Sequence, residues 1–163
     1  MGAWNGLSRR EDDHQSLLSS ELNRLDIGIA ALSEVQRPDC GEIMAGGYTY
    51  SWSGRPDGYH AQGVAVTVSN KLTPMIIEVS PVNEGIMRRR IRHSLGVISL
   101  VSVYAPNEAS DLTVKDAFYA TLESVVDQSH RRDTLIVLGN SMHQFELIGM
   151  VMRHVLVPMG LEL

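Results

Sequence analysis

The chain has 163 residues, 44% of them hydrophobic, and a net charge of −5 at pH 7. This length suits one domain, and the hydrophobic fraction is sufficient for a globular core. The negative charge excludes a general electrostatic attraction to nucleic acid, so that phosphate binding must come from a local patch or a metal ion.

Cysteine content and hydropathy indicate where the protein resides. The one cysteine, Cys40, cannot form an internal disulfide, and the sequence contains neither a signal peptide nor an apolar run near twenty residues. We therefore expect a protein of a reducing intracellular compartment, nucleus or cytoplasm, without membrane contact.

The first third of the sequence predicts a helix followed by two strands. Leucines recur at helical spacing in residues 13–25, with polar residues on the opposite face. The short apolar run 27–32 reads as a strand buried on both faces. Pro38 and residues 41–47 mark a loop, and residues 48–53 alternate aromatic and small polar side chains as a half-buried strand does.

The rest of the sequence is richer in strands than in helices. Residues 111–128 form the second clear helical pattern, with Thr113 as its candidate N-cap. Further strands are expected at 63–69, 75–80, 86–93, 96–104 and 135–139, with a tight turn between 86–93 and 96–104. Helices that fall between runs of strands favour a layered α/β or α+β domain with mixed sheets.

Four polar residues stand where apolar strands end. Glu34 follows the strand 27–32, Tyr104 closes 96–104, Asn140 follows 135–139, and Asn5 lies in a Trp-Asn pair near the start. Ligands bind at the carboxyl ends of strands in open α/β sheets, so these side chains are candidates for one shared site. The structural alternatives are a solvated strand end for Glu34, a packed tyrosine and a terminal turn at Asn5.

The same strand ends carry a resemblance to a known family. The stretches AWN, ALSEV, VSVYAPN and TLIVLGN resemble motifs of the endonuclease/exonuclease/phosphatase superfamily, in order and at plausible spacing over about residues 3–139. The sequence more closely resembles the endonuclease domains of non-LTR retrotransposons and a cellular relative that looks like a domesticated copy. Residues 53–72 and 93–128 carry this closer resemblance.

The resemblance implies a fold and a metal. The expected fold is an incomplete four-layered DNase I-like α/β sandwich with mixed, largely antiparallel sheets. Residues 1–139 would form a truncated domain of this family, followed by a divergent apolar tail at 140–163. The family hydrolyses phosphodiesters with a divalent cation, usually Mg²⁺, and a hard cation prefers oxygen ligands.

Family roles carry over to some positions and not to others. By resemblance, Glu34 binds the metal, Asn5 orients metal and phosphate, and Tyr104 hydrogen-bonds the phosphate. Asn140 occupies the position of the catalytic aspartate, and Met142 that of the asparagine two residues on. An asparagine has no anionic state with which to activate water, and loss of a proton-transfer group typically costs about 10²- to 10⁴-fold in rate.

The end of the sequence departs further from the family pattern. The family's late Asp-His pair has no counterpart, and we interpret two histidines of the tail, His143 and His154, as incidental. Apolar residues of the tail are expected to cover an open sheet edge or to pack poorly.

Arginines are the remaining candidates for nucleic-acid binding. Alternation in 86–93 places Arg88, Arg90 and Arg92 on one strand face, where they are candidates for phosphate contacts. The alternative is a solvated face whose arginines pair with acids. The turn that contains Asp57, Tyr59 and His60 is a weaker candidate for DNA contact, and a plain surface loop is its alternative.

Three functions are compatible with these residues. The favoured one is a retrotransposon-derived, DNA endonuclease-like domain with impaired catalysis, with DNA as its partner and no protein partner identified. The alternative is an active Mg²⁺-dependent DNA endonuclease. A plain interaction domain without phosphate chemistry is the third, and it would gain if Glu34 and Tyr104 lay far apart.

Overall fold

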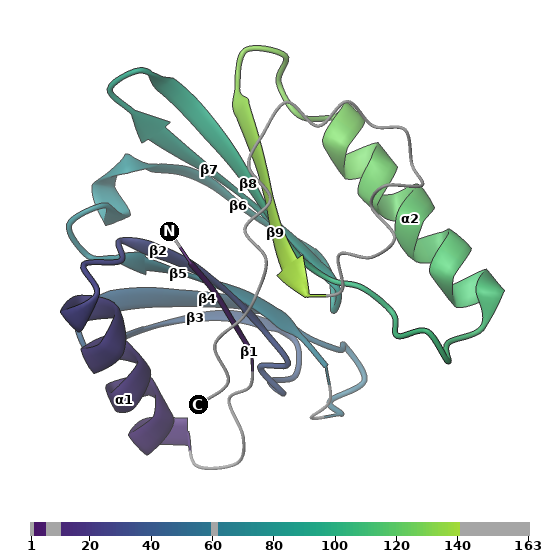
Figure 1. Cartoon of the computed structure of the whole chain (residues 1–163), viewed down its shortest axis with the longest axis horizontal. Coiled ribbons are helices and arrows are strands. Elements are labelled where there is room, and N and C mark those ends of the chain that lie inside the picture. Colours follow the sequence, from purple (N-terminus) through teal and green to yellow (C-terminus); the bar gives the residue numbers. More distant parts are fainter. Residues whose placement is uncertain (1, 6–10, 60–61, 141–163) are drawn as a thin grey trace.

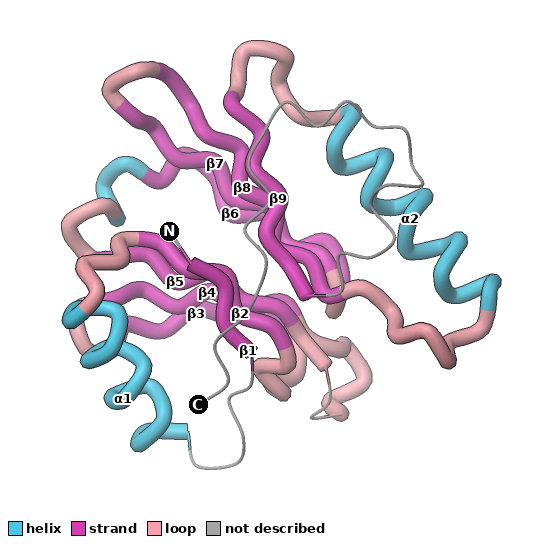
Figure 2. The backbone as a smooth tube through the Cα atoms, in the orientation of Figure 1, coloured by secondary structure: helices cyan, strands magenta, loops and turns pink. Residues whose placement is uncertain are grey.

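Two β-sheets packed face to face, each with one helix on its outer side, make up the fold of the chain (Figures 1 and 2). The structure, a computed structural model, describes residues 2–5, 11–59 and 62–140. The layers follow one another as helix, sheet, sheet, helix. This confirms the layered α/β domain predicted from the sequence pattern and the four-layered sandwich that the family resemblance implies.

The first sheet has five strands in the order β1-β2-β5-β4-β3. Strands β1 and β2 are parallel, and all other neighbours in this sheet are antiparallel. Helix α1 (Glu11–Arg24) packs on the outer face through Leu18 and Leu22. The strands are β1 (Gly2–Asn5), β2 (Ile29–Ser33), β3 (Cys40–Ala45), β4 (Tyr48–Ser53) and β5 (Val64–Ser69).

The second sheet has four strands in the order β6-β7-β8-β9. Strands β8 and β9 are parallel, and the others are antiparallel. Helix α2 (Leu112–Asp127) covers the outer face through Phe118, Leu122 and Val125. The strands are β6 (Ile76–Asn83), β7 (Ile86–His93), β8 (Gly96–Tyr104) and β9 (Thr134–Asn140), and a 3-10 turn (Thr73–Met75) precedes β6.

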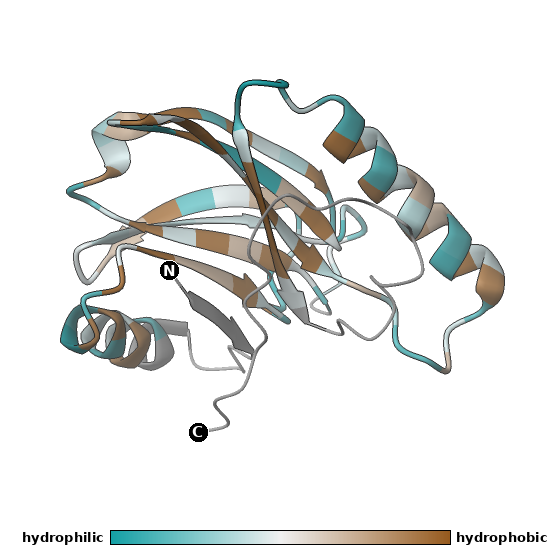
Figure 3. Cartoon of the chain, turned by 45° about the horizontal axis from the view of Figure 1, so that its top comes forward, coloured by the Kyte–Doolittle hydropathy of each residue, from teal (hydrophilic) through white to brown (hydrophobic). Residues whose placement is uncertain are grey.

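The main core lies between the two sheets. Strand alternation places every second residue on the inner face, so that Val64, Val66 and Val68 of β5 meet Met87 and Leu100 of the other sheet. The hydropathy view shows hydrophobic and hydrophilic residues alternating along α2 and along the coloured part of α1, as expected for helices with one packed side (Figure 3).

Most elements lie where the sequence predicts them, with three corrections. Residues 40–45, expected within a loop, form the edge strand β3. Strand β4 is buried on both faces rather than half-buried. Asp111, not Thr113, is the N-cap of α2, and its side chain makes no capping hydrogen bond. The tail after residue 140 lies outside the described residues.

Candidate functional site

Four strand ends meet at one rim of the sandwich. Because β1 and β2 are parallel, Asn5 lies opposite Ser33, the residue before Glu34. Because β8 and β9 are parallel, Asn140 lies opposite Tyr104. Figure 1 shows β1 and β9 running toward the same end of the molecule. The backbone pairing therefore places all four predicted residues at this rim.

Glu34 occupies an unusual backbone conformation at the end of β2. Its φ angle is 56°, in the left-handed region that side chains other than glycine rarely adopt. The following residues hold this turn in place, because Val35 N–H donates to Gly63 O at 3.3 Å and Gln36 N–H donates to Gln62 O at 2.8 Å. Gln36, Asp39 and Gln62 also have positive φ angles, so this conformation is a feature of the turns around Glu34 and does not by itself mark Glu34 as functional.

Tyr104 links the two sheets at the rim. Its hydroxyl donates a hydrogen bond to Glu34 Oε1 at 3.0 Å. Burial, and then the Glu34 carboxylate, raises the pKa of Tyr104 to about 12. The phenol is therefore protonated at neutral pH and acts as a hydrogen-bond donor.

The donor set at the rim fits a weakly held hard cation. Mg²⁺ is commonly bound through one or two carboxylates, with water and substrate phosphate completing its shell. Glu34 supplies one carboxylate, and within residues 2–5, 11–59 and 62–140 no group of three His, Cys, Asp or Glu side chains is arranged to hold a metal. A cation at Glu34 would thus depend on water and on phosphate oxygens.

Other predicted residues of this site are placed only in part. The backbones of Asn5 and Asn140 lie at the rim, while their side chains are outside the described structure. Met142, His143 and His154 belong to residues that the structure does not describe.

The predicted arginines lie away from the rim and two are paired with acids. Arg88, Arg90 and Arg92 lie opposite Val101, Ser99 and Val97 of β8, progressively farther from its rim end.

The acids that pair with Arg88 and Arg90 come from the same sheet or its border: Glu78 lies in β6, and Asp133 directly precedes β9. Arg88 Nη2 is 2.7 Å from Glu78 Oε1, and Arg90 Nε donates to Asp133 Oδ2 at 2.7 Å. Ser80 first and Arg88 second lower the pKa of Glu78, and Arg90 lowers that of Asp133. These contacts favour the structural alternative for Arg88 and Arg90 over phosphate binding.

The charged side chains of the turn after β4 pair with each other. Arg55 Nη2 lies 2.5 Å from Asp57 Oδ2, and this hydrogen bond lowers the pKa of Asp57 to about 2. Tyr59 lies beside the Arg55 guanidinium. His60 lies outside the described residues. The plain surface-loop interpretation accounts for Asp57 and Tyr59.

A pocket beside Tyr104 was not anticipated from the sequence. It has a volume of about 420 Å³ and lies between helix α2 and the β6–β7 turn. Asn107 lines it, and the sequence could have indicated this residue because it directly follows the Tyr-Ala-Pro stretch. Asn83, in the β6–β7 hairpin, carried no signal because hairpin turns commonly contain asparagine.

Comparison with curated proteins gives distant relatives. No family model matches the chain. Craniofacial development protein 2 of Bos taurus is 22% identical over 140 residues, and that of Tragulus javanicus is 21% identical over the same length. These alignments cover 86% of this chain but 23% and 24% of the relatives, so the chain spans about a quarter of their length.

Solved structures share the fold over 85% of the chain. The AP endonuclease LMAP from Leishmania major has a TM-score of 0.63 at 13% identity, with 53% of its length covered. The endonuclease domain of TRAS1, a telomere-specific non-LTR retrotransposon, has a TM-score of 0.57 at 21% identity, and D. rerio TDP2 complexed with single-strand DNA product 0.56 at 12%. The chain covers 58% of each of these two. Neither α1 nor α2, the helices of the described residues, has the length and apolar character needed to cross a membrane.

Proposed function

We propose that this chain, which has the DNase I-like fold of the endonuclease/exonuclease/phosphatase superfamily, is an endonuclease-like domain that binds DNA phosphodiesters but hydrolyses them poorly. In this proposal Glu34 holds a Mg²⁺ ion, and Tyr104 and Asn5 help to orient the phosphate. Descent from a retrotransposon endonuclease is part of the proposal, supported by the likeness to the TRAS1 domain.

The observation that carries the proposal is the hydrogen bond between Tyr104 and Glu34. These residues are 70 positions apart in the sequence and end strands of different sheets, yet their side chains meet at 3.0 Å. Tyr104 packs against the core between the sheets, and its hydroxyl makes the hydrogen bond to Glu34. This polar contact between the two sheets, made by two residues predicted to share a site, supports the proposal of a binding site at the rim.

Each group would have a distinct part in phosphodiester binding. A bound divalent cation would polarise a phosphoryl oxygen and offset its negative charge. Glu34 contributes the anionic oxygen that such a cation prefers. Tyr104 has one O–H, which donates to Glu34 in this structure and would turn to the phosphate when a cation engages the carboxylate.

Impaired hydrolysis follows from the residue at the end of β9. Asn140, in register with Tyr104, cannot take a proton from water at neutral pH. The 163 residues themselves contain no aspartate after Asp133 that would replace it. The expected loss is about 10²- to 10⁴-fold in rate.

Binding and cutting of DNA test this proposal separately. The 163-residue chain is incubated with plain duplex DNA and with duplex DNA containing an abasic site, in Mg²⁺ or in a chelator. We expect Mg²⁺-dependent binding without efficient cutting. Glu34→Gln should weaken the Mg²⁺-dependent binding, and Glu123→Gln, on the exposed side of α2, should not. Absence of Mg²⁺-dependent DNA binding would overturn the proposal.

An active Mg²⁺-dependent endonuclease is the second candidate. The intact pairing of Glu34 with Tyr104 favours it. Efficient cutting by the unchanged chain, abolished by Glu34→Gln, would establish this activity and refute the impairment. A gain of cutting in Asn140→Asp would assign the impairment to that position.

A further inference from the structure

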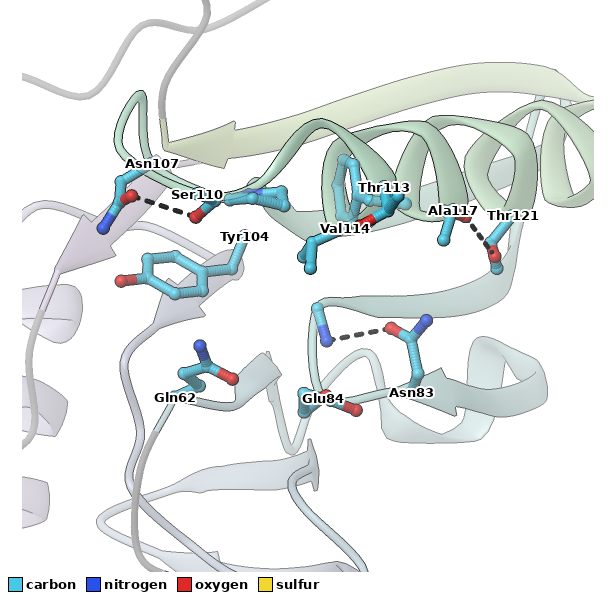
Figure 4. Close-up of a pocket in the computed structure, with 13 residues that line it drawn as sticks. Gln62, Asn83, Glu84, Tyr104, Asn107, Ser110, Thr113, Val114, Ala117 and Thr121 are labelled. Atoms are coloured by element: carbon cyan, nitrogen blue, oxygen red, sulfur yellow. Dashed lines mark hydrogen bonds between the residues drawn. The ribbon is translucent and has the colours of Figure 1, made fainter.

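The pocket beside Tyr104 is built from two parts of the second sheet and helix α2 (Figure 4). The β6–β7 turn forms one wall, and the first turns of α2 with the loop before it form the other. Gln62 closes one end, where Tyr104 also lies. The volume of about 420 Å³ falls in the range of small-molecule sites.

Hydrogen bonds within the chain hold the pocket wall in place. Tyr104 N–H donates to Gly85 O at 2.8 Å, and Gly85 N–H donates to Asn83 Oδ1 at 2.9 Å. A side chain at position 85 would crowd Tyr104 O at 3.1 Å and the Phe118 ring at 3.3 Å. These contacts fix the turn against the strand end, so a ligand would meet a preformed surface.

The chemistry of the wall favours a neutral ligand with hydrogen-bonding edges. Asn83 and Asn107 each use the side-chain oxygen internally, toward Gly85 N–H and the Ser110 hydroxyl, so their NH₂ groups are available as donors. Glu84 adds an acceptor. Pro106, Val114 and Phe118 supply apolar contact area.

Charge argues against a second phosphate in the same place. Among the lining residues that the structure describes, none is Lys or Arg, and Glu84 is the one charged side chain. A phosphate would be repelled by this carboxylate and would find no cation. A nucleobase, in contrast, is planar, uncharged and carries both donors and acceptors at its edges.

We propose that this pocket receives an unpaired nucleobase next to the phosphodiester held at Glu34, and we call it the base pocket. Tyr104 belongs to both sites, since its ring lines the pocket while its hydroxyl reaches Glu34. The substrate class is then a strand with an unstacked nucleotide at the bound phosphate. The adjacency to a phosphate rests on the proposed function, whereas base binding itself does not.

Filling the pocket from α2 tests the inference. Ala117 lines the pocket and Ala120 does not, and both are exposed on the same helix. Ala117→Trp should therefore occupy the pocket, and Ala120→Trp serves as a matched control. Circular dichroism of both variants checks that the helix is retained.

The readout is the affinity for two single-stranded oligonucleotides, one with bases and one made of abasic units, measured by fluorescence anisotropy. The unchanged chain and Ala120→Trp should prefer the base-containing strand by about tenfold, a size typical of base contacts. Ala117→Trp should bind both strands equally. A preference retained in Ala117→Trp would overturn the base pocket.

Further measurements separate this inference from the proposed function. Glu34→Gln should weaken binding of both oligonucleotides alike and leave their ratio unchanged. Free adenosine, cytidine and uridine at millimolar concentration, followed by backbone NMR, should shift Asn107, Thr113 and Ala117 even when no oligonucleotide binds. Nucleosides that shift Asn107 and Thr113 as much in Ala117→Trp as in the unchanged chain, or that shift none of the three residues in the unchanged chain, would refute the base pocket whatever the outcome for the phosphate.

Discussion

Tyr104 shows how one residue joins burial, charge and hydrogen bonding. Its pKa of about 12 lies above the ordinary value of 10.0, because the folded environment favours the protonated phenol. A group with a raised folded-state pKa contributes stability that is fully present below the unfolded value and is lost as the pH rises through the folded one. The stability contributed by Tyr104 should therefore decline between pH 10 and about 12 and stay lost at higher pH.

We expect spectrophotometric titration to reveal this residue. The difference between the unchanged chain and Tyr104→Phe should contain one phenol that ionises at about pH 12. Glu34→Gln should lower this pKa only partly, because burial is its largest cause and the carboxylate the smaller one. A Tyr104 that titrates near pH 10 would contradict both its burial and its contact with Glu34.

Arg89 is the large polar side chain buried between the sheets. It is 0% exposed, donates to the Ser51 hydroxyl, and reaches Glu42 Oε2 at 3.4 Å. Within the described part of the chain, its Nε and Nη1 have no partner. Burial lowers the pKa of Arg89 to about 10, because removing the charged guanidinium from water costs free energy.

The effect of replacing Arg89 on the free energy of unfolding should therefore depend on the volume of the new side chain rather than on its charge. We expect Arg89→Met to leave the free energy of unfolding unchanged or to raise it by about 1–4 kcal/mol, since Ser51 retains Glu42 as a partner. Arg89→Ala should lower it by about 2–5 kcal/mol through a cavity. Chemical denaturation compares the two, and equal losses in both variants would show that the guanidinium itself is required.

At the scale of elements, the parallel pair β8–β9 depends on a close approach. A Cβ at Gly139 would overlap Val103, including its backbone oxygen, which cannot move aside. Gly28→Ala is a matched control, because its Cβ would meet only the end of the flexible Leu72 side chain, at 2.9 Å.

We expect Gly139→Ala to lower the free energy of unfolding by about 1–3 kcal/mol, the usual cost of overpacking. Gly28→Ala should cost less than Gly139→Ala. Urea denaturation measures both. Equal stability of Gly139→Ala and the unchanged chain would mean that β9 does not pack this closely on β8.

Local patterns explain which elements the sequence could predict. Strands β7 and β8 were predicted with their observed bounds because each has clear alternation or a continuous apolar run ending at a turn. Strand β3 was missed because it is an edge strand with mostly exposed side chains and an internal glycine, so no buried face marks it. The N-cap at Asp111 was missed because Asp111 and Thr113 are both preferred cap types.

The sequence could predict which polar residues follow strands, but not which of them contact one another. The sequence places Glu34 and Tyr104 after strands, but their contact depends on how the two sheets pack, which no local pattern encodes. The left-handed backbone at Glu34 and the base pocket likewise arise from tertiary contacts, with Gly63 and with helix α2.

At the scale of the whole molecule, the rim joins the two sheets. Glu34 belongs to the first sheet and Tyr104 to the second, so a ligand bound between them would oppose separation of the sandwich. With a net charge of −5, any DNA contact must come from a local patch or a bound cation. Metal binding should therefore be visible in global stability, not only in DNA binding.

We expect Mg²⁺ to raise the midpoint of thermal unfolding of the unchanged chain. A concentration ten times the Kd corresponds to about 1.4 kcal/mol of stabilisation, because a ligand that binds only the folded state shifts the equilibrium by mass action. Glu34→Gln keeps a hydrogen-bond acceptor for Tyr104 but removes the anionic ligand, so this gain should disappear. Glu84→Gln, which neutralises a carboxylate of the neighbouring pocket, should retain it. A gain that persists in Glu34→Gln would place the cation elsewhere on the molecule, and the rim would then lose its part in phosphate binding.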